Sequence, residues 1–306
     1  MKRKIAVCAL STSVFLILLS SFYFFLKRPE KVETPKMSEE EKKVIIVRDA
    51  TYSSEKAGRI DLRLKAKIAK KYMDRSEVDL EGIEGRYISG KEGEIAFKGE
   101  RGLVDTEKQN AALYGFFASF LNEYEVKTKS INVDLKTGSI SGDEVVVVKG
   151  KNLSMVGTGI RGELKEGKFT LLKDVSGTVE IQGEGYEFEA STFTYEKSKQ
   201  MYSLSGNVVV DKKGMRLKCE RMEIYEEEGQ PKKVEAKGNV EMDSKGTIAK
   251  SHEAVYDFSE KRVVFSGNAW VKREDMELKG NRIVYLVEEG RFFTLSPRMK
   301  ILRSGS

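Results

Sequence analysis

A Gly-Asn pair that recurs at a nearly constant interval constrains the fold of this chain more than any other feature. In the last third of the 306 residues, short apolar runs open at Gly206-Asn207, Gly238-Asn239 and Gly267-Asn268. A tyrosine follows each glycine eighteen or nineteen residues later, at Tyr225, Tyr256 and Tyr285. Gly177-Thr178 with Tyr195 fits the same frame one unit earlier. A period of about thirty residues in β-type sequence predicts stacked hairpin-like units that share one long core.

The rest of the chain from Val44 onward also has the pattern of β-strands. Runs such as Ile60-Leu62-Leu64 carry apolar residues at every second position, which puts one face of a strand toward a core. Turn pairs such as Lys149-Gly150 separate these runs. No proline occurs between Lys36 and Gln230, which suits continuous sheet because proline cannot donate to a ladder. The sequence therefore predicts an all-β fold of antiparallel strands.

One segment, Ala111 to Leu121, has helical spacing as well as good helix-forming residues. It contains Gly115 and several aromatic residues, and it lies between strand patterns. We interpret it as a strand, since propensity is a weak guide against tertiary context, but its register stays open over residues 105–125.

Alignment of the four units on their glycines shows an apolar face and a column of small residues. The small residues stand thirteen positions after each glycine, at Ala190, Cys219, Ser251 and Gly280. Cores are usually filled by large aliphatic side chains, so this column could leave width inside the fold for an apolar guest. It is equally compatible with two sheets that pack closely at that level.

The N-terminus carries a predicted membrane anchor. Ile5 to Leu26 is uncharged and long enough for a helix to cross a bilayer core of roughly 30 Å. A cleaved signal peptide is the alternative, but its apolar region would be shorter and end in small residues, whereas this one ends in Phe22 to Leu26. We expect residues 1–28 to form a cytoplasmic tail and anchor, residues 29–44 a linker, and the bulk to lie outside the cytoplasm.

Charge and composition exclude several function classes. The formal net charge is +6, but residues 1–28 hold five basic and no acidic side chains, so the remainder is close to neutral. This argues against nucleic-acid binding, which needs a clustered basic face. The lone histidine, His252, lacks companion ligands, so we predict no metal. No nucleophile, P-loop or dinucleotide motif is visible, and we predict no cofactor and no catalytic activity.

The repeating units resemble the OstA-like repeats of lipopolysaccharide-export proteins of the LptA type. The resemblance rests on Gly206-Asn207-Val208, Gly238-Asn239-Val240 and Ala254-Val255-Tyr256-Asp257. The preceding segment resembles the LptC family through its single anchor, the strand Ser141 to Val147 and the turn-containing run Met155 to Ile160. The two resemblances imply an LptC-like jellyroll over residues 45–176 and an LptA/OstA-like jellyroll over residues 177–306.

The resemblance implies an elongated, twisted antiparallel β-jellyroll with an apolar trough. Lipopolysaccharide acyl chains would lie in this trough and pass from an inner-membrane ABC transporter complex of the LptB, LptF and LptG type toward the outer membrane. A further LptA-like or LptD-like jellyroll would join by edge strands, at the C-terminal end around Arg291 to Leu302. The cell inner membrane would hold the anchor, with the bulk of the chain in the periplasm.

The residues predicted to line the trough follow from the apolar columns of the units. In the second segment they are Val208, Val210, Leu217, Val240, Met242, Ala249, Val271 and Leu278. In the first segment they are Val145, Val147 and Ile160. Charged residues between these positions, such as Glu241 and Lys250, would face solvent.

Two hypotheses from other classes remain open. A membrane-anchored structural or adhesive β-solenoid without lipid cargo would fill its core with its own side chains. An enzyme on a β scaffold would need paired carboxylates brought together from distant strands, which a sequence alone does not reveal.

Overall fold

The computed structural model describes residues 43–56, 59–88, 94–120, 124–274, 276–294 and 298–301. Residues Val44–Ser306 form one compact unit. The predicted anchor and most of the predicted linker lie outside the described residues. None of the described residues forms a helix that could span a lipid bilayer.

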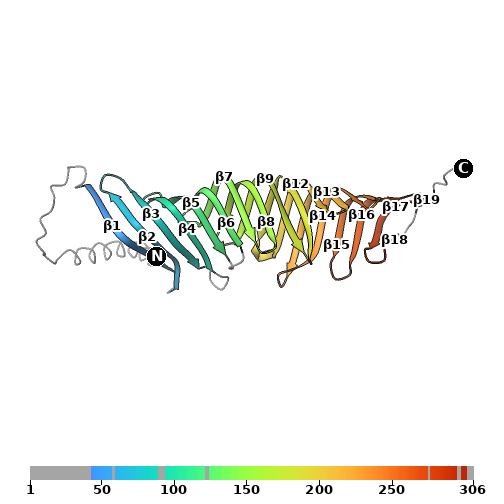
Figure 1. Ribbon diagram of the computed structural model, residues 1–306, viewed down its shortest axis with the longest axis horizontal. Helices are drawn as coiled ribbons and strands as arrows, with labels where there is room; N and C mark the ends of the chain where they lie inside the picture. Colours follow the sequence, from blue (N-terminus) through green and yellow to red (C-terminus); the bar gives the residue numbers. More distant parts are fainter. Residues whose placement is uncertain are drawn as a thin grey trace, which may run out of the picture. The chain divides into compact units, whose positions relative to one another are not determined.

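The described chain consists of β-strands, apart from turns and one short 3-10 turn at Lys197–Lys199 (Figure 1). The strands of the first half are β1 (Val44–Lys56), β2 (Arg59–Tyr72), β3 (Glu77–Ile88), β4 (Glu94–Asp105), β5 (Asn110–Phe120), β6 (Tyr124–Asp134), β7 (Ser139–Gly150), β8 (Leu153–Glu163) and β9 (Lys168–Ile181). Those of the second half are β10 (Glu184–Ala190), β11 (Thr192–Glu196), β12 (Met201–Lys212), β13 (Met215–Glu227), β14 (Gln230–Ser244), β15 (Thr247–Asp257), β16 (Arg262–Arg273), β17 (Met276–Leu286), β18 (Arg291–Thr294) and β19 (Arg298–Ile301).

The ladder follows the order of the sequence. From β1 to β9, each strand pairs antiparallel with the next. β10 and β11 lie end to end between β9 and β12, and the ladder then continues to β17, which pairs with β18 and β19. The predicted all-β antiparallel fold is confirmed. β5 confirms the strand interpretation of the ambiguous segment up to Phe120, and its pairing defines the register there.

The Gly-Asn pairs are corners at which long strands bend. In β12 the register shifts between Ser205 and Val208, so Gly206 and Asn207 stand opposite the single residue Glu220. Both have positive φ angles, 79° and 49°. This is a bulge of two residues against one, and it sharply increases the bend and twist of a strand. The pairs of β14 and β16 produce the same shift.

Gly238 illustrates why a corner requires glycine. Its φ of 78° is a backbone conformation that residues with a side chain rarely adopt. A Cβ atom at this position would lie 2.4 Å from Glu220 Oε2. Glu220 instead accepts a 2.6 Å hydrogen bond from the side-chain amide of Asn239. The Gly-Asn sequence therefore meets both the backbone and the packing requirements of the bend.

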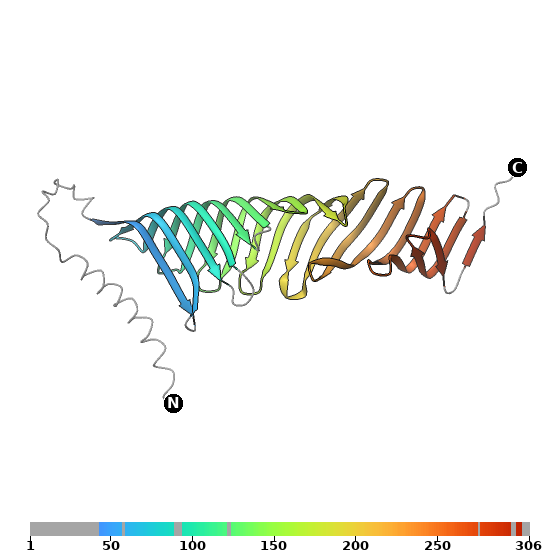
Figure 2. The same ribbon diagram turned by 60° about the horizontal axis from the view of Figure 1, so that its bottom comes forward.

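Because of these corners, each long strand contributes to two layers, which cross in Figure 1 and are seen from another side in Figure 2. In β12, Met201–Ser205 belongs to one layer, called layer A, and Val208–Lys212 to the other, called layer B. In β13 the order is reversed: Met215–Cys219 lies in layer B and Arg221–Tyr225 in layer A. Buried side chains from both layers form one hydrophobic cluster from Ala66 to Ile283.

Candidate functional site: an apolar groove between two layers

Six of the predicted trough residues lie side by side on the inner face of layer B. Successive strand pairings give the order Val210, Leu217, Met242, Ala249, Val271 and Leu278. Met242, Ala249, Val271 and Leu278 are buried, whereas Val210 and Leu217 are half-buried. Val208 and Val240, also buried, belong to the next row toward the corners, where they pair with Cys219 and Ser251. The second segment thus has the single apolar face that the sequence predicts.

In the first segment the predicted inward face is partly wrong. Val145 is 51% exposed, whereas Val146 is fully buried and Val148 is 7% exposed. The cause is a bulge between Gly142 and Val145, which places two residues of β7 opposite one of β8 and reverses the alternation. Val147 therefore belongs to the same outward set as Val145, although it is half-buried. The third predicted residue of this segment, Ile160, is buried as expected.

The column of small residues lies beside the corners, at the closed side of the groove. Ala190, Cys219 and Ser251 are each between 6% and 8% exposed, and Gly280 pairs with the buried Ala269. Burial also raises the pKa of the Cys219 thiol to about 11. Two layers that converge at a corner leave little width, so this geometry favours the close-packing interpretation of the column.

Layer A supplies a second inner row, of which the sequence pattern singled out only the tyrosines Tyr195, Tyr256 and Tyr285. The row lies two residues farther from the corners than the buried side chains Leu204, Met222 and Phe265, and its members are half-buried. Across the second segment it runs through Tyr195, Tyr202, Ile224, Val234, Tyr256, Val263, Tyr285 and Phe292. Rings contact one another along it: Tyr195 and Tyr202 are tilted with centroids 5.0 Å apart, and Tyr285 and Phe292 are stacked with centroids 4.3 Å apart.

This row continues without a break into the first segment, where two of its members, Ala111 and Gly162, are buried. From Tyr195 it passes through Phe169, Gly162, Ile140, Val133, Ala111, Val104 and Val78. The row of layer B is equally continuous, through Phe188, Gly177, Met155, Val148, Val126, Ala118 and Phe97. The inner face of the described chain is therefore one surface and not two.

A cavity of about 500 Å³ lies against the polar face of layer A in the first segment. Most of its lining side chains, such as Asn132, Ser141 and Arg161, alternate along their strands with members of the inner row. The cavity therefore belongs to the outer face of the layer and is separate from the apolar groove.

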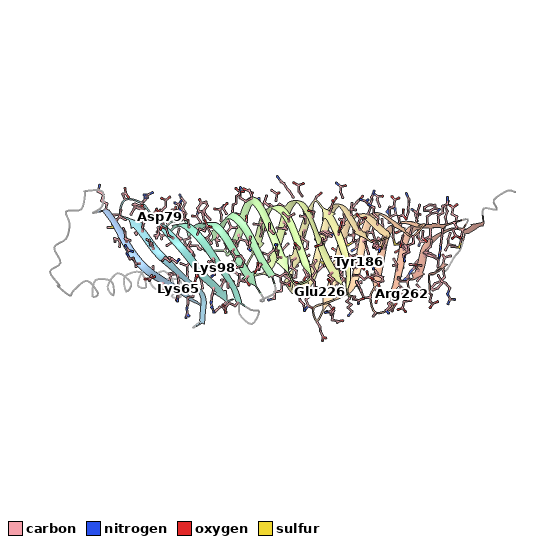
Figure 3. The ribbon with its side chains drawn as sticks, in the orientation of Figure 1. Lys65, Asp79, Lys98, Tyr186, Glu226 and Arg262 are labelled. Atoms are coloured by element: carbon pink, nitrogen blue, oxygen red, sulfur yellow. The ribbon has the colours of Figure 1, made fainter. Side chains whose placement is uncertain are left out.

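The two layers meet across the mouth of the groove near the middle of the chain. Tyr202 in layer A hydrogen-bonds with Tyr124, the first residue of β6 in layer B, and with Glu226 of β13. Burial raises the pKa of Tyr202 well above its usual range. Burial also raises the pKa of the Glu226 carboxyl, whereas the hydrogen bond with Tyr202 acts to lower that pKa. Figure 3 labels Glu226 among the side chains of this region. A residue of the first segment therefore faces two residues of the second.

The outer faces are polar and carry ion pairs. Lys250 Nζ lies 3.0 Å from Glu241 Oε1 with both side chains about half exposed. On layer A, Glu223 is nearly buried and binds Lys237 at 3.0 Å and Arg221 at 2.7 Å. His252 is exposed at a corner. Among the described residues, no group of three or more histidine, cysteine, aspartate or glutamate side chains could hold a metal ion.

Comparison with known proteins identifies the chain. The family model described as lipopolysaccharide-assembly, LptC-related, matches residues 13–180. The chain belongs to this LptC-related family. A second model, the LptA/LptD N-terminal domain of lipopolysaccharide transport proteins, matches residues 187–291. The boundary between the two matches falls at the tight turn between β9 and β10.

Among solved structures, the chain is similar to LptH from Pseudomonas aeruginosa, described as the LptA-homologous periplasmic component of the lipopolysaccharide transport device. The identity is 18%, the TM-score is 0.35, and the match covers 39% of this chain and 95% of LptH. A search of curated protein sequences gave no match.

This LptC-related chain is a component of the lipopolysaccharide transport bridge, with an LptC segment followed by an LptA/LptD-type segment in one polypeptide. Both family descriptions name proteins of lipopolysaccharide assembly or transport.

Proposed function

We propose that the groove between layers A and B carries the acyl chains of lipopolysaccharide while the sugar and phosphate groups stay at its mouth. The observation that supports this most is the pair of inner rows that run through both family segments. A lipid chain of many methylenes gains about 0.8 kcal/mol for each one that it buries. A continuous apolar surface therefore removes the main barrier to crossing an aqueous compartment, and no chemical step is needed.

The half-buried side chains are the first candidates for lipid contact. Val210 and Leu217 in layer B and the tyrosine-rich row in layer A are accessible to a guest in the closed groove. Val240, Ala249 and Val271 are almost fully buried, so a guest reaches them only if the layers separate. The predicted trough residues thus divide into contacts at the mouth and contacts that need opening. The proposal includes Val208, Met242, Leu278 and Ile160 in the second group.

The remaining parts of the proposal concern the setting of the groove. Residues 1–28 anchor the chain in the inner membrane, and residues 45–176 and 177–306 act as the LptC-like and LptA-like jellyrolls of one non-catalytic bridge. An ABC transporter complex of the LptB, LptF and LptG type delivers lipid to the N-terminal end. At the other end the short strands β18 and β19 each pair with β17 alone, which leaves edges for an LptA-like or LptD-like partner.

Site-specific photocrosslinking tests the proposal. A photoreactive residue replaces Leu217, which faces the groove, and a matched probe replaces its neighbour Lys218, which is exposed on the outer face. Both are introduced into the full-length protein in membranes that make lipopolysaccharide. We expect a lipid adduct at position 217 and none at position 218.

Absence of an adduct at both positions, with the protein folded and inserted, contradicts lipid carriage and favours the structural solenoid. Equal adducts at both positions contradict the assignment of the inner face.

A further inference from the structure

Lys212 occupies an inner-face position at the mouth of the groove. Along β12, alternate residues point to the same side of a strand, so Lys212 shares the face of Val208 and Val210. Its side chain is 27% exposed, compared with 52% for Lys250 on the outer face. Charged side chains are rarely placed against apolar surface unless a partner meets them. The position of Lys212 therefore suggests a partner at the mouth.

The groups around Lys212 on layer B are the hydroxyl and ring of Tyr186 and one exposed carboxylate, that of Glu184. The Nζ atom of Lys212 lies 3.4 Å from the hydroxyl of Tyr186 and 5.1 Å from the centre of that ring. Tyr186 lies on the same face of β10 as the buried Phe188, two residues closer to the mouth. The acidic partner, Glu184, is 3.6 Å away and 60% exposed. Such an exposed pair contributes little and leaves the ammonium group available to another anion.

Layer A brings a second lysine and a second tyrosine to the same place. Burial is the largest cause that raises the pKa of Tyr256, and the neighbouring Tyr186 adds to it. The charges of Lys261 and Lys212 act on Tyr256 in the opposite direction, so both ammonium groups lie within electrostatic range of its hydroxyl. Lys261 pairs with Glu288, which is 66% exposed. Lys212, Lys261 and Tyr186 (labelled in Figure 3) thus all lie within electrostatic range of Tyr256.

We propose that Lys212, Lys261, Tyr186 and Tyr256 bind a phosphate group carried by an amphiphile whose apolar chains lie in the groove. The inference rests on the proposed function and specifies where the head of the cargo is held. Lysine ammonium groups and hydroxyls are donors to phosphate oxygens, and charged hydrogen bonds are about twice as strong as neutral ones. Directly below Lys212 and Tyr186, Val210 and Phe188 supply apolar surface for the chains. Glu184 and Glu288, both exposed, can turn toward solvent when the phosphate binds.

Binding of fluorescent lipopolysaccharide to the purified full-length protein in mild detergent tests this site. The phosphorylated lipid is compared with the same lipid after chemical removal of its phosphates. We expect the double variant K212Q/K261Q to weaken binding of the phosphorylated lipid about tenfold and to leave binding of the dephosphorylated lipid unchanged. K250Q, which removes an exposed lysine from the outer face, should bind both lipids like the wild-type protein.

The remaining outcomes each overturn the inference in a distinguishable way. If the wild-type protein binds both lipids equally well and the double variant matches it, the phosphate site is wrong but lipid carriage stands. A double variant that loses both lipids equally shows a structural role for the lysines. Binding of neither lipid by the wild-type protein contradicts the proposed function itself. Displacement of the lipid by equimolar inorganic phosphate would assign the site to free anions.

Discussion

Replacing Val240 by aspartate measures how apolar the inner face is. Val240 is 2% exposed and lies between the corner and the row of Met242. Loss of its burial costs about 2 kcal/mol. The new carboxyl group has to be protonated to avoid a buried charge. Neutral pH lies roughly three units above the ordinary pKa of aspartate, and protonation costs about 1.4 kcal/mol for each unit. The sum, about 6 kcal/mol, is comparable to the whole stability of a typical domain.

Glu241→Lys provides the matched control one residue away. Glu241 is 48% exposed and pairs with Lys250 at 3.0 Å. In the ladder it stands beside Lys218 and Lys250, so a lysine here adds like charges on a solvated face. Loss of an exposed ion pair and the new repulsion together cost about 1 kcal/mol.

Urea unfolding, followed by the fluorescence of Trp270 and by circular dichroism, compares the two variants. We expect the Val240→Asp protein to be unfolded or to have a strongly lowered midpoint, and the Glu241→Lys protein to stay close to the wild type. The loss of stability in Val240→Asp relative to the wild type should shrink near pH 4, because the aspartate in the unfolded chain then also takes up a proton. Equal losses in the two variants, or a deficit that is independent of pH, would refute the inward orientation of Val240.

Three further predictions follow from other parts of the chain. Cys219, with its pKa raised to about 11, should react with iodoacetamide at pH 8 on the order of a hundredfold more slowly in the folded protein than in urea. Backbone N–H groups, first that of Lys108, hold the pKa of the Asp105 carboxyl below its usual range. The stabilising effect of the ionised carboxyl is therefore fully present above the unfolded pKa and is lost progressively as the pH falls from there toward the lower folded pKa, so the difference in urea midpoint between wild type and Asp105→Asn should begin to shrink below about pH 4. Cleavage at a protease site inserted in the Gln182-Gly183 turn should leave the two fragments bound, because β9 pairs with both β10 and β11; their separation on a sizing column would contradict a shared core.

The period of the sequence predicted the inner face where Gly-Asn corners mark the bends. The corner resets the alternation in the same way in β12, β14 and β16, so Val208, Val240 and Val271 could be placed from their distance to the glycine. In β7 the bulge falls at Asp143-Glu144, two residues that carry no such signal. The inward and outward alternation predicted for β7 beyond this bulge is therefore one residue out of step with the structure.

The tyrosines show that a one-residue difference in spacing has a physical meaning. Tyr195, Tyr256 and Tyr285 stand eighteen residues after their glycines and lie in the half-buried row. Tyr225 stands nineteen residues after Gly206 and lies on the opposite face, where its hydroxyl donates a 3.0 Å hydrogen bond to Glu223. Parity along a strand decides the face, so the sequence already distinguished Tyr225 from the others.

The polar groups at the mouth could not be predicted in this way, because they depend on how the layers cross. Lys212 and Tyr256 are three strands apart in the ladder, yet they come within electrostatic range because one lies in layer B and the other in layer A. A repeat pattern describes the neighbours within a layer. It contains no information about which strand of one layer faces which strand of the other.

The same crossing determines how the two family segments are joined. Tyr124 lies in the segment that matches LptC, and its partner Tyr202 lies in the segment that matches the LptA/LptD domain. Near the boundary, one wall of the groove therefore comes from the first segment and the other wall from the second. Two separate proteins joined end to end at their edges would have to pay the entropy of association to build such a wall. In this chain the turn between β9 and β10 makes the contact intramolecular, so the groove stays continuous at any protein concentration.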